Sequence, residues 1–164
     1  MDLVASRLFS KAETELSSRS ANNGTKGAFN GMNPKIDILA IGEPLVEFNE
    51  IVDASDVIYR PGHGGDTSNA IIAAARQGAR TAYFTHLGDD AFGRQFIDLW
   101  DKEGVARDHV VRRADSRTGV YFVTHGPDGH SFSYYRAGSA ASLVAPKDLP
   151  EGLVESARIL HVSG

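Results

Sequence analysis

The sequence predicts an α/β domain built around a mostly parallel central sheet. Two short apolar runs at 36–41 and 81–85 predict buried strands, and helical spacing of apolar residues follows each of them along the chain. Both helical segments end at a glycine, Gly78 or Gly104, which is a common helix terminator. Alternating strands and helices are typical of parallel strands joined by helical crossovers. A β-hairpin at 118–136 adds a second, antiparallel part.

The length and composition of the chain are those of one globular domain. Its 164 residues are 41% hydrophobic and 23% charged, which allows a sizeable core. No apolar run approaches the ~20 residues that span a bilayer, so we expect no membrane partner. The formal charge of −4 argues against a nucleic-acid partner, which requires a basic surface. The absence of cysteine excludes disulfides and fits a reducing, cytoplasmic compartment.

Residues 1–33 differ in composition from the rest of the chain. They are rich in Ser, Asn and Gly and lack the apolar centre of a secretory signal. Asp2, Glu13 and Glu15 also argue against an organelle transit peptide, which is poor in acids. We therefore expect 1–33 to be a disordered extension and the folded part to cover 34–164.

The first strands and the first helix are expected between residues 36 and 85. Ile36–Ile41 (IDILAI) predicts a central strand, and the loosely alternating Leu45–Val52 (LVEFNEIV) predicts a half-exposed one. Ser68–Gln77 has apolar residues along one side and predicts a helix of about three turns. Thr81–Thr85 (TAYFT) predicts the next strand.

A second helix is expected after the acidic pair Asp89 and Asp90. Its apolar spacing runs through Phe92, Phe96 and Leu99 and ends at a glycine. The two acids suggest either a metal pair or a helix N-cap, and the cap is the simpler interpretation. The histidines of the chain lack the spacing of zinc ligands, so no metal site is predicted.

The remaining strands surround a turn and close the sequence. Thr118–His125 and His130–Arg136 flank the residues GPDG and predict a hairpin. Ala157–Gly164 (ARILHVSG) predicts a last strand at the end of the chain.

The register of the hairpin groups three polar side chains. If His125 faces His130, then Tyr121 lies opposite Tyr134. The two-residue period of a strand places Arg136 on the same face as Tyr134. This face is either a ligand-binding patch of two phenols and a guanidinium or an ordinary solvated strand face with cross-strand aromatics.

A glycine-rich segment, RPGHGGDTSNA at 60–70, predicts a loop before the first helix. A phosphate-binding P-loop is excluded because no lysine follows the glycines. A dinucleotide fingerprint requires a third glycine where Thr67 stands. A dinucleotide-binding domain is kept as an alternative that binding of NAD would reveal.

The polar residues of this segment suit a sugar better than a phosphate. Gly64 and Gly65 allow close backbone approach to a ligand. The stretch DTSN that follows offers groups that bind hydroxyls, whereas the carboxylate of Asp66 would repel a phosphate. In the alternative interpretation, Asp66 or Thr67 only caps the helix and the glycines only form the turn.

Several of these stretches together resemble a known family. GGDTSNAIIAAARQGARTAYFTHLGDDAFG is similar to the first signature of the ribokinase-like (PfkB) carbohydrate kinases. IGEPLVEF, TGVY, SYYRAGSAAS and ILHVSG narrow the resemblance toward 2-keto-3-deoxygluconate kinases. It covers Ile36 to Gly164 and implies a ribokinase-like layered fold with a small β-lid, whose strands lie near 44–60 and in the hairpin 118–136.

The resemblance also implies which residues bind the acceptor. In that family the Gly-Gly-Asp loop and the following Asn hold the sugar acid, and a tyrosine and a Tyr-x-Arg sequence contact it. Glu47 corresponds to an acid that binds hydroxyls in ribokinase. An arginine suits a carboxylate because its planar fork donates two parallel hydrogen bonds. The implied substrate-binding residues are Gly64, Gly65, Asp66, Asn69, Tyr121, Tyr134 and Arg136.

The implied activity is ATP-dependent phosphorylation of 2-keto-3-deoxygluconate or a related sugar acid. The implied cosubstrate and cofactor are ATP and Mg²⁺. A homodimer through the β-lid is also implied. The family's catalytic base lies in a Gly-Ala-Gly-Asp motif, and no Gly-x-Gly-Asp follows Gly65. The expectation is an N-terminal, sugar-acceptor part, truncated before the nucleotide-binding half, with the catalytic base beyond Gly164. The alternative is a noncatalytic sugar-acid-binding or interaction protein derived from such a kinase.

Overall fold

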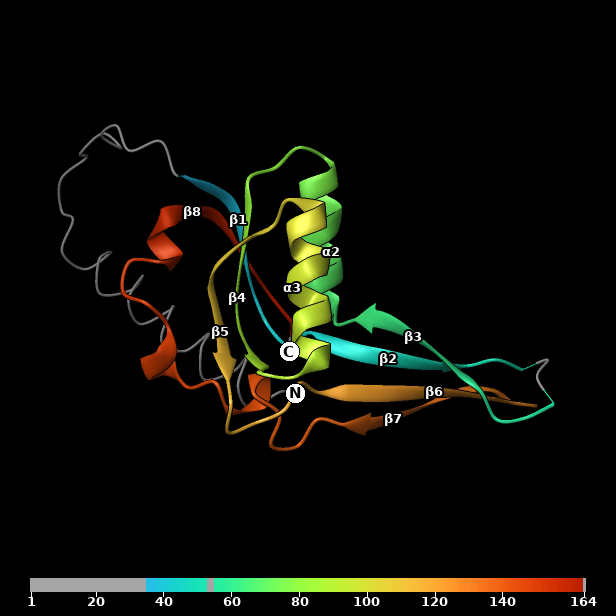
Figure 1. Ribbon diagram of the computed structural model, residues 1–164. Coiled ribbons are helices and arrows are strands. Elements are labelled where there is room, and N and C mark those ends of the chain that lie inside the picture. The colour runs from blue at the N-terminus through green and yellow to red at the C-terminus, as the bar shows by residue number, and fades with distance from the viewer. Residues whose placement is uncertain (1–34, 53–54, 164) are drawn as a thin grey trace, which may run out of the picture.

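The computed structural model describes residues 35–52 and 55–163, in two parts. One part is a layered α/β body, and the other is a flat four-stranded sheet, the lid, that projects away from it (Figure 1). The extension predicted for 1–33 lies outside the described residues. In the described part of the chain, no helix has the length and apolar character needed to cross a bilayer.

The sheet of the body contains four parallel strands in the order β5-β4-β1-β8. This confirms the predicted α/β fold with a parallel sheet. The strand β5 was not predicted, because its charged residues face solvent at the sheet edge and hide the strand pattern. The strands are β1 (Ile36–Ile41), β4 (Thr81–Gly88), β5 (Ala106–Arg113) and β8 (Ala157–Val162).

Two helices, α2 (Asp66–Arg76) and α3 (Ala91–Glu103), lie side by side on one face of this sheet (Figure 1). The Asp90 carboxylate caps α3 by accepting the Gly93 N–H at 2.8 Å, as predicted. The cap residue of α2 is Gly65, with φ of 98° and no side-chain cap. The alternative in which Asp66 or Thr67 caps α2 is therefore wrong, because the helix already includes Asp66.

Apolar side chains fill both faces of the body sheet. Trp100 of α3 and Tyr83 of β4 are fully buried between the helices and the sheet, with ring centroids 4.8 Å apart. On the other face, Phe84 and Leu39 pack under short 3-10 turns within 141–156. These turns are Ala141–Leu143, Pro146–Asp148 and Val154–Ser156.

The lid has the strand order β3-β2-β6-β7. Its two central strands are parallel, and each edge strand is antiparallel to its neighbour. The predicted loop over 60–65 is wrong, since most of it belongs to the edge strand β3, where Pro61 is tolerated. The strands are β2 (Leu45–Glu50), β3 (Tyr59–Gly64), β6 (Val120–Gly126) and β7 (Gly129–Tyr135).

The hairpin of β6 and β7 has the predicted register. His125 pairs with His130, and Tyr121 pairs with Tyr134. The strand β7 ends at Tyr135, so Arg136 lies one residue beyond it. The strand period that placed Arg136 on the face of Tyr134 therefore does not extend to it.

Candidate functional site

Three polar side chains form a row across one face of the lid, at neighbouring positions of β2, β6 and β7. Glu47 pairs in register with Tyr121, which pairs with Tyr134. The Tyr121 hydroxyl donates a hydrogen bond to Glu47 Oε2. The rings of Tyr121 and Tyr134 are stacked, with centroids 5.5 Å apart and planes 28° apart. We call Glu47, Tyr121 and Tyr134 the lid row.

The lid row has a buried base and an open end. Tyr121 is 9% exposed, whereas Tyr134 is 57% exposed. Burial raises the pKa of Tyr121, and the hydrogen bond to Glu47 and the charges of Glu47, Tyr134 and Asp66 raise it further. Tyr121 therefore remains a protonated hydrogen-bond donor at neutral pH, while Tyr134 offers an aromatic face to solvent.

The glycine pair lies at the point where the lid meets α2. A Cβ at Gly64 would overlap the hydroxyl and ring of Tyr121, so this glycine makes room for the lid row. Gly65 has a positive φ, and a Cβ there would collide with the Glu43 carbonyl oxygen. Both glycines are thus required by contacts within the chain. Asp66 follows them, exposed and within electrostatic range of Tyr121.

The polar residues of α2 divide into two groups. Asn69 is exposed one turn along the helix, and within the described ranges its side chain makes no hydrogen bond. Thr67 and Ser68 are buried instead. The Thr67 hydroxyl bonds with that of Tyr83 at 2.6 Å, and Trp100 Nε1 donates to Ser68 Oγ at 3.1 Å. These two hydroxyls hold α2 to the core and are not available to a ligand, contrary to the prediction for DTSN.

Arg136 belongs to a second polar group at the base of the lid. Its guanidinium forms an ion pair with Glu43 Oε2, and Ser139 Oγ donates to Glu43 Oε1 at 2.7 Å. The sequence did not predict this role of Glu43. The available signal was its position just after the central strand β1, because functional residues gather at the carboxyl ends of parallel strands.

The lid is also anchored to the start of α3. Asp90 accepts hydrogen bonds from the Thr118 N–H at 2.9 Å and the Thr118 hydroxyl at 3.0 Å, besides capping the helix. Thr118 Oγ1 in turn accepts the Gly88 N–H at 3.0 Å. Burial alone would raise the pKa of Asp90, but the hydrogen bonds from Thr118 and Gly93 hold it below its usual range. Of the two acids that precede α3, Asp90 thus has a structural role, as the cap of the helix and the acceptor for Thr118.

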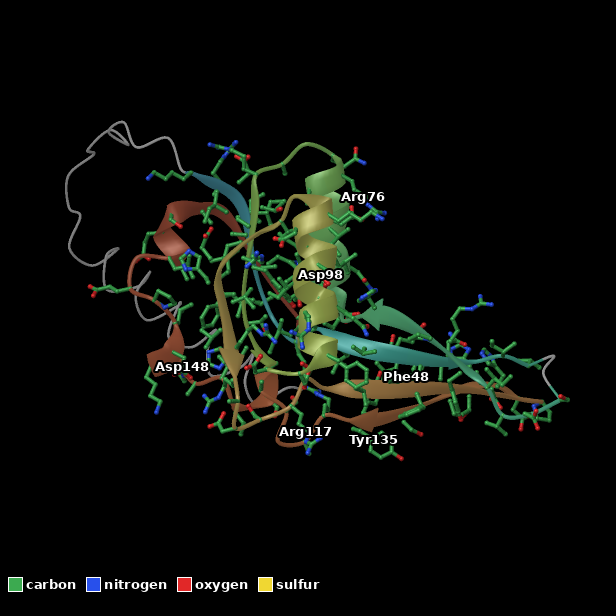
Figure 2. All side chains as sticks on the ribbon, in the orientation of Figure 1. Phe48, Arg76, Asp98, Arg117, Tyr135 and Asp148 are labelled. Atoms are coloured by element: carbon green, nitrogen blue, oxygen red, sulfur yellow. The ribbon has the colours of Figure 1, made fainter. Side chains whose placement is uncertain are left out.

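A cavity of about 560 Å³ lies beside this anchor. It is formed by the start of α3, residues 115–118 and 120, and residues 135 and 137–139, and none of the seven predicted substrate-binding residues lines it. Figure 2 shows Arg117 and Tyr135, both part of its lining, along the same lower edge of the molecule. The cavity and the lid row are thus different places in the fold.

The described residues do not fit a nucleotide phosphate or a metal ion. The first turn of α2 carries Asp66 and the N-terminus of α3 is capped by Asp90, so a carboxylate occupies the place where a phosphate would bind. Within the described residues, no three His, Asp or Glu side chains gather to hold a metal. The glycines at 62–65 lie at an antiparallel lid strand, not between a first parallel strand and its helix as a dinucleotide fingerprint requires.

Comparisons with known proteins agree with this architecture. The family model described as "pfkB family carbohydrate kinase" matches residues 33–164. The chain is 36% identical over 135 residues to a 2-dehydro-3-deoxygluconokinase from Thermoproteus tenax, covering 79% of this chain and 42% of that protein. It is 34% identical over 139 residues to Fructokinase-2 from Solanum habrochaites, covering 82% and 42%. The chain thus spans about 42% of the length of these curated relatives.

Solved structures show the same likeness. A fructokinase from Xylella fastidiosa superposes with a TM-score of 0.71 at 29% identity, covering 78% of this chain and 41% of that one. A 2-dehydro-3-deoxygluconokinase from Thermotoga maritima gives 0.66 at 24% identity, with 77% and 40% covered, and bears on the fold alone.

Proposed function

Because the chain belongs to the pfkB family of carbohydrate kinases, we propose that it carries the acceptor-binding part of a kinase for 2-keto-3-deoxygluconate or a related sugar acid. The observation that carries this proposal is the lid row, which lies over Gly64 and within range of Asp66. It combines carboxylates, a phenol and an exposed aromatic ring, which are the groups that bind sugars.

Each part of the lid row has a role in this proposal. The carboxylates of Glu47 and Asp66 accept hydrogen bonds from sugar hydroxyls, since an ionised carboxylate is an acceptor only. The Tyr121 phenol oxygen accepts from a sugar hydroxyl, because its own proton is donated to Glu47. The exposed face of Tyr134 covers the apolar side of the sugar. Asn69 and the backbone at Gly64 and Gly65 complete the acceptor side.

Arg136 is the group that favours an acidic sugar. Its guanidinium has five donors in a planar fork and lies at the base of the lid, in an ion pair with Glu43. Such a planar fork suits a carboxylate of the substrate. The relatives include kinases named for an acidic sugar and kinases named for a neutral one. Their names therefore do not decide between the two substrates, and our choice of a sugar acid depends on Arg136.

ATP and Mg²⁺ are the proposed cosubstrate and cofactor of the whole protein. The fructokinase from Xylella fastidiosa has also been solved with bound ATP. In the present chain, the carboxylates at both helix N-termini do not suit phosphate. We therefore propose a role in acceptor binding for the described residues and assign them no step of phosphoryl transfer.

Calorimetry of the purified chain tests the acceptor site. We expect 2-keto-3-deoxygluconate to bind, and Tyr134→Ala to weaken binding by on the order of tenfold, as loss of a buried aromatic contact does. Tyr135→Ala is the matched control, because Tyr135 is the next residue and faces the other side of the lid. A folded sample that binds no sugar acid would contradict the proposal.

The alternative is a noncatalytic sugar-acid-binding protein with the same site. A coupled assay with ATP, Mg²⁺ and 2-keto-3-deoxygluconate, run on the product of the whole reading frame, separates the two functions. Phosphorylation of the sugar supports the kinase, whereas binding of the sugar without turnover supports the binding protein.

Two further properties are proposed with this function. The lid exposes large apolar side chains, among them Tyr135 at 66% and Val57 at 75%, and a homodimer through the lid would cover them. Sedimentation equilibrium should show a dimer that Tyr135→Asp weakens, and a monomer at all concentrations would contradict it.

We also propose a cytoplasmic location, which the absence of cysteine suits.

A further inference from the structure

Glu43 lies in the corner between the body and the lid, just after β1 and before β2. Its side chain is 9% exposed and that of its partner Arg136 is 35% exposed. Ser139 donates to the other carboxylate oxygen at 2.7 Å. The Glu43 carboxylate is thus held in one place, with its charge opposed by Arg136.

The surrounding backbone leaves room for this carboxylate. A Cβ at Gly119 would lie 3.0 Å from Glu43 Oε1, and a Cβ at Gly65 would collide with the Glu43 carbonyl oxygen. Glycines therefore border Glu43 on two sides. The same Gly65 joins this corner to Gly64, against which Tyr121 of the lid row packs. The backbone of Glu43 and the base of the lid row are thus linked through two adjacent glycines.

We infer that Glu43 is a specificity-determining residue that reduces the preference of this site for acidic over neutral sugars. The inference rests on the proposed function, in which Arg136 binds the carboxylate of the substrate. A bound sugar acid would bring a second carboxylate to a guanidinium that Glu43 already partly neutralises. Repulsion between two carboxylates about 6 Å apart at a partly exposed site costs on the order of tenfold in affinity. A neutral sugar experiences no such repulsion.

The test compares the dissociation constants of 2-keto-3-deoxygluconate and fructose, measured by calorimetry on the full chain. In Glu43→Gln, which keeps the shape and the acceptor oxygen, we expect the preference for the acid to rise on the order of tenfold through tighter acid binding. Glu50→Gln is the matched control, because Glu50 is a lid carboxylate that accepts the His125 N–H at 2.8 Å and does not contact Arg136. Its preference should equal that of the unmodified chain.

A charge cycle keeps the test valid if Glu43→Gln does not fold. Arg136→Gln should lower the preference for the acid, and adding Glu43→Gln to it should raise the preference again by on the order of tenfold, because the repelling carboxylate is removed. A preference that Glu43→Gln leaves unchanged in both backgrounds, or shifts toward fructose, overturns the inference.

The same cycle separates this inference from the proposed function. If Arg136→Gln weakens both sugars equally, Arg136 does not bind the carboxylate, and the acid-binding role and the inference both fail. If it weakens only the acid while Glu43→Gln has no effect, the proposed function stands and the inference alone fails. If the folded chain binds neither sugar, the acceptor site itself is wrong.

Discussion

The body encloses its largest side chains between helices and sheet, whereas the lid leaves much of its surface in solvent (Figure 2). In the body, Trp100, Tyr83 and Phe96 are fully buried, and the ring of Trp100 contacts the other two. In the lid, the side chains are positioned by polar contacts and by glycines that leave room for them. An example is the hydrogen bond between Tyr121 and Glu47 over Gly64. Substitutions in the body should therefore mainly alter the free energy of unfolding. Substitutions in the lid should mainly alter the placement of its side chains and the affinity for a sugar.

The largest expected effect is in the body. Trp100→Ala removes a fully buried indole and leaves the Ser68 hydroxyl without its donor. We expect a loss of about 3–5 kcal/mol in the free energy of unfolding, measured by urea denaturation. Asp98→Ala on the same helix is the control, because Asp98 is exposed and should change stability by less than about 0.5 kcal/mol. Similar losses in both variants would contradict the assignment of the core to this face of the sheet.

A smaller effect is expected where the lid meets the body. In Gly64→Ala the added methyl overlaps the Tyr121 ring and hydroxyl, and such overpacking costs about 1–3 kcal/mol in unfolding free energy. Tyr121→Phe in the same chain should relieve part of this cost, since it removes the nearest atom. Gly126→Ala is the control within the lid, because its added carbon would lie 3.9 Å from the Gly129 carbonyl oxygen, an ordinary van der Waals distance. Additive losses for the Gly64→Ala and Tyr121→Phe pair would show that the two residues are not in contact.

The fold could be predicted where local forces decide it. The strand Ile36–Ile41, the helix stop at Gly104 and the cap at Asp90 follow from periodicity and from backbone chemistry, which act within a few residues. The strand Tyr59–Gly64 could not be predicted, because glycine and proline normally favour a turn and only pairing with β2 makes this segment a strand.

The candidate site shows the same division. The pairing of Tyr121 with Tyr134 was predictable because a short turn fixes the register of a hairpin. The ion pair of Glu43 with Arg136 was not, because it joins segments far apart in the sequence that meet only after the lid packs on the body. Thr67 and Ser68 were expected to be polar groups for a ligand, but burial by Tyr83 and Trp100 gives them a role in the core.

The anchor at Asp90 should give a pH-dependent contribution to stability. Asp90→Asn weakens three hydrogen bonds that the carboxylate accepts, and we expect a loss of about 1–2 kcal/mol at neutral pH. The folded pKa lies below the unfolded value of 3.8, so the stabilisation is present above 3.8 and is lost as the pH falls through the folded pKa. Urea denaturation from pH 6 to below pH 3.8 should show a constant difference between the two chains above 3.8 and a shrinking one below it. A difference that stays constant across the whole range would contradict the charged role of Asp90.

The smallest stability effect, and the sharpest test of the lid row, is Tyr121→Phe. Loss of one hydrogen bond to the half-buried Glu47 should cost about 1 kcal/mol in unfolding free energy. If the phenol oxygen also accepts a hydrogen bond from a sugar hydroxyl, the same variant should weaken binding of 2-keto-3-deoxygluconate by on the order of tenfold. Glu47→Gln keeps an acceptor for Tyr121 and should spare stability more than sugar affinity. A Tyr121→Phe chain with lower stability and unchanged sugar affinity would make the lid row a purely structural contact, and the lid would then differ from the body only in its exposure.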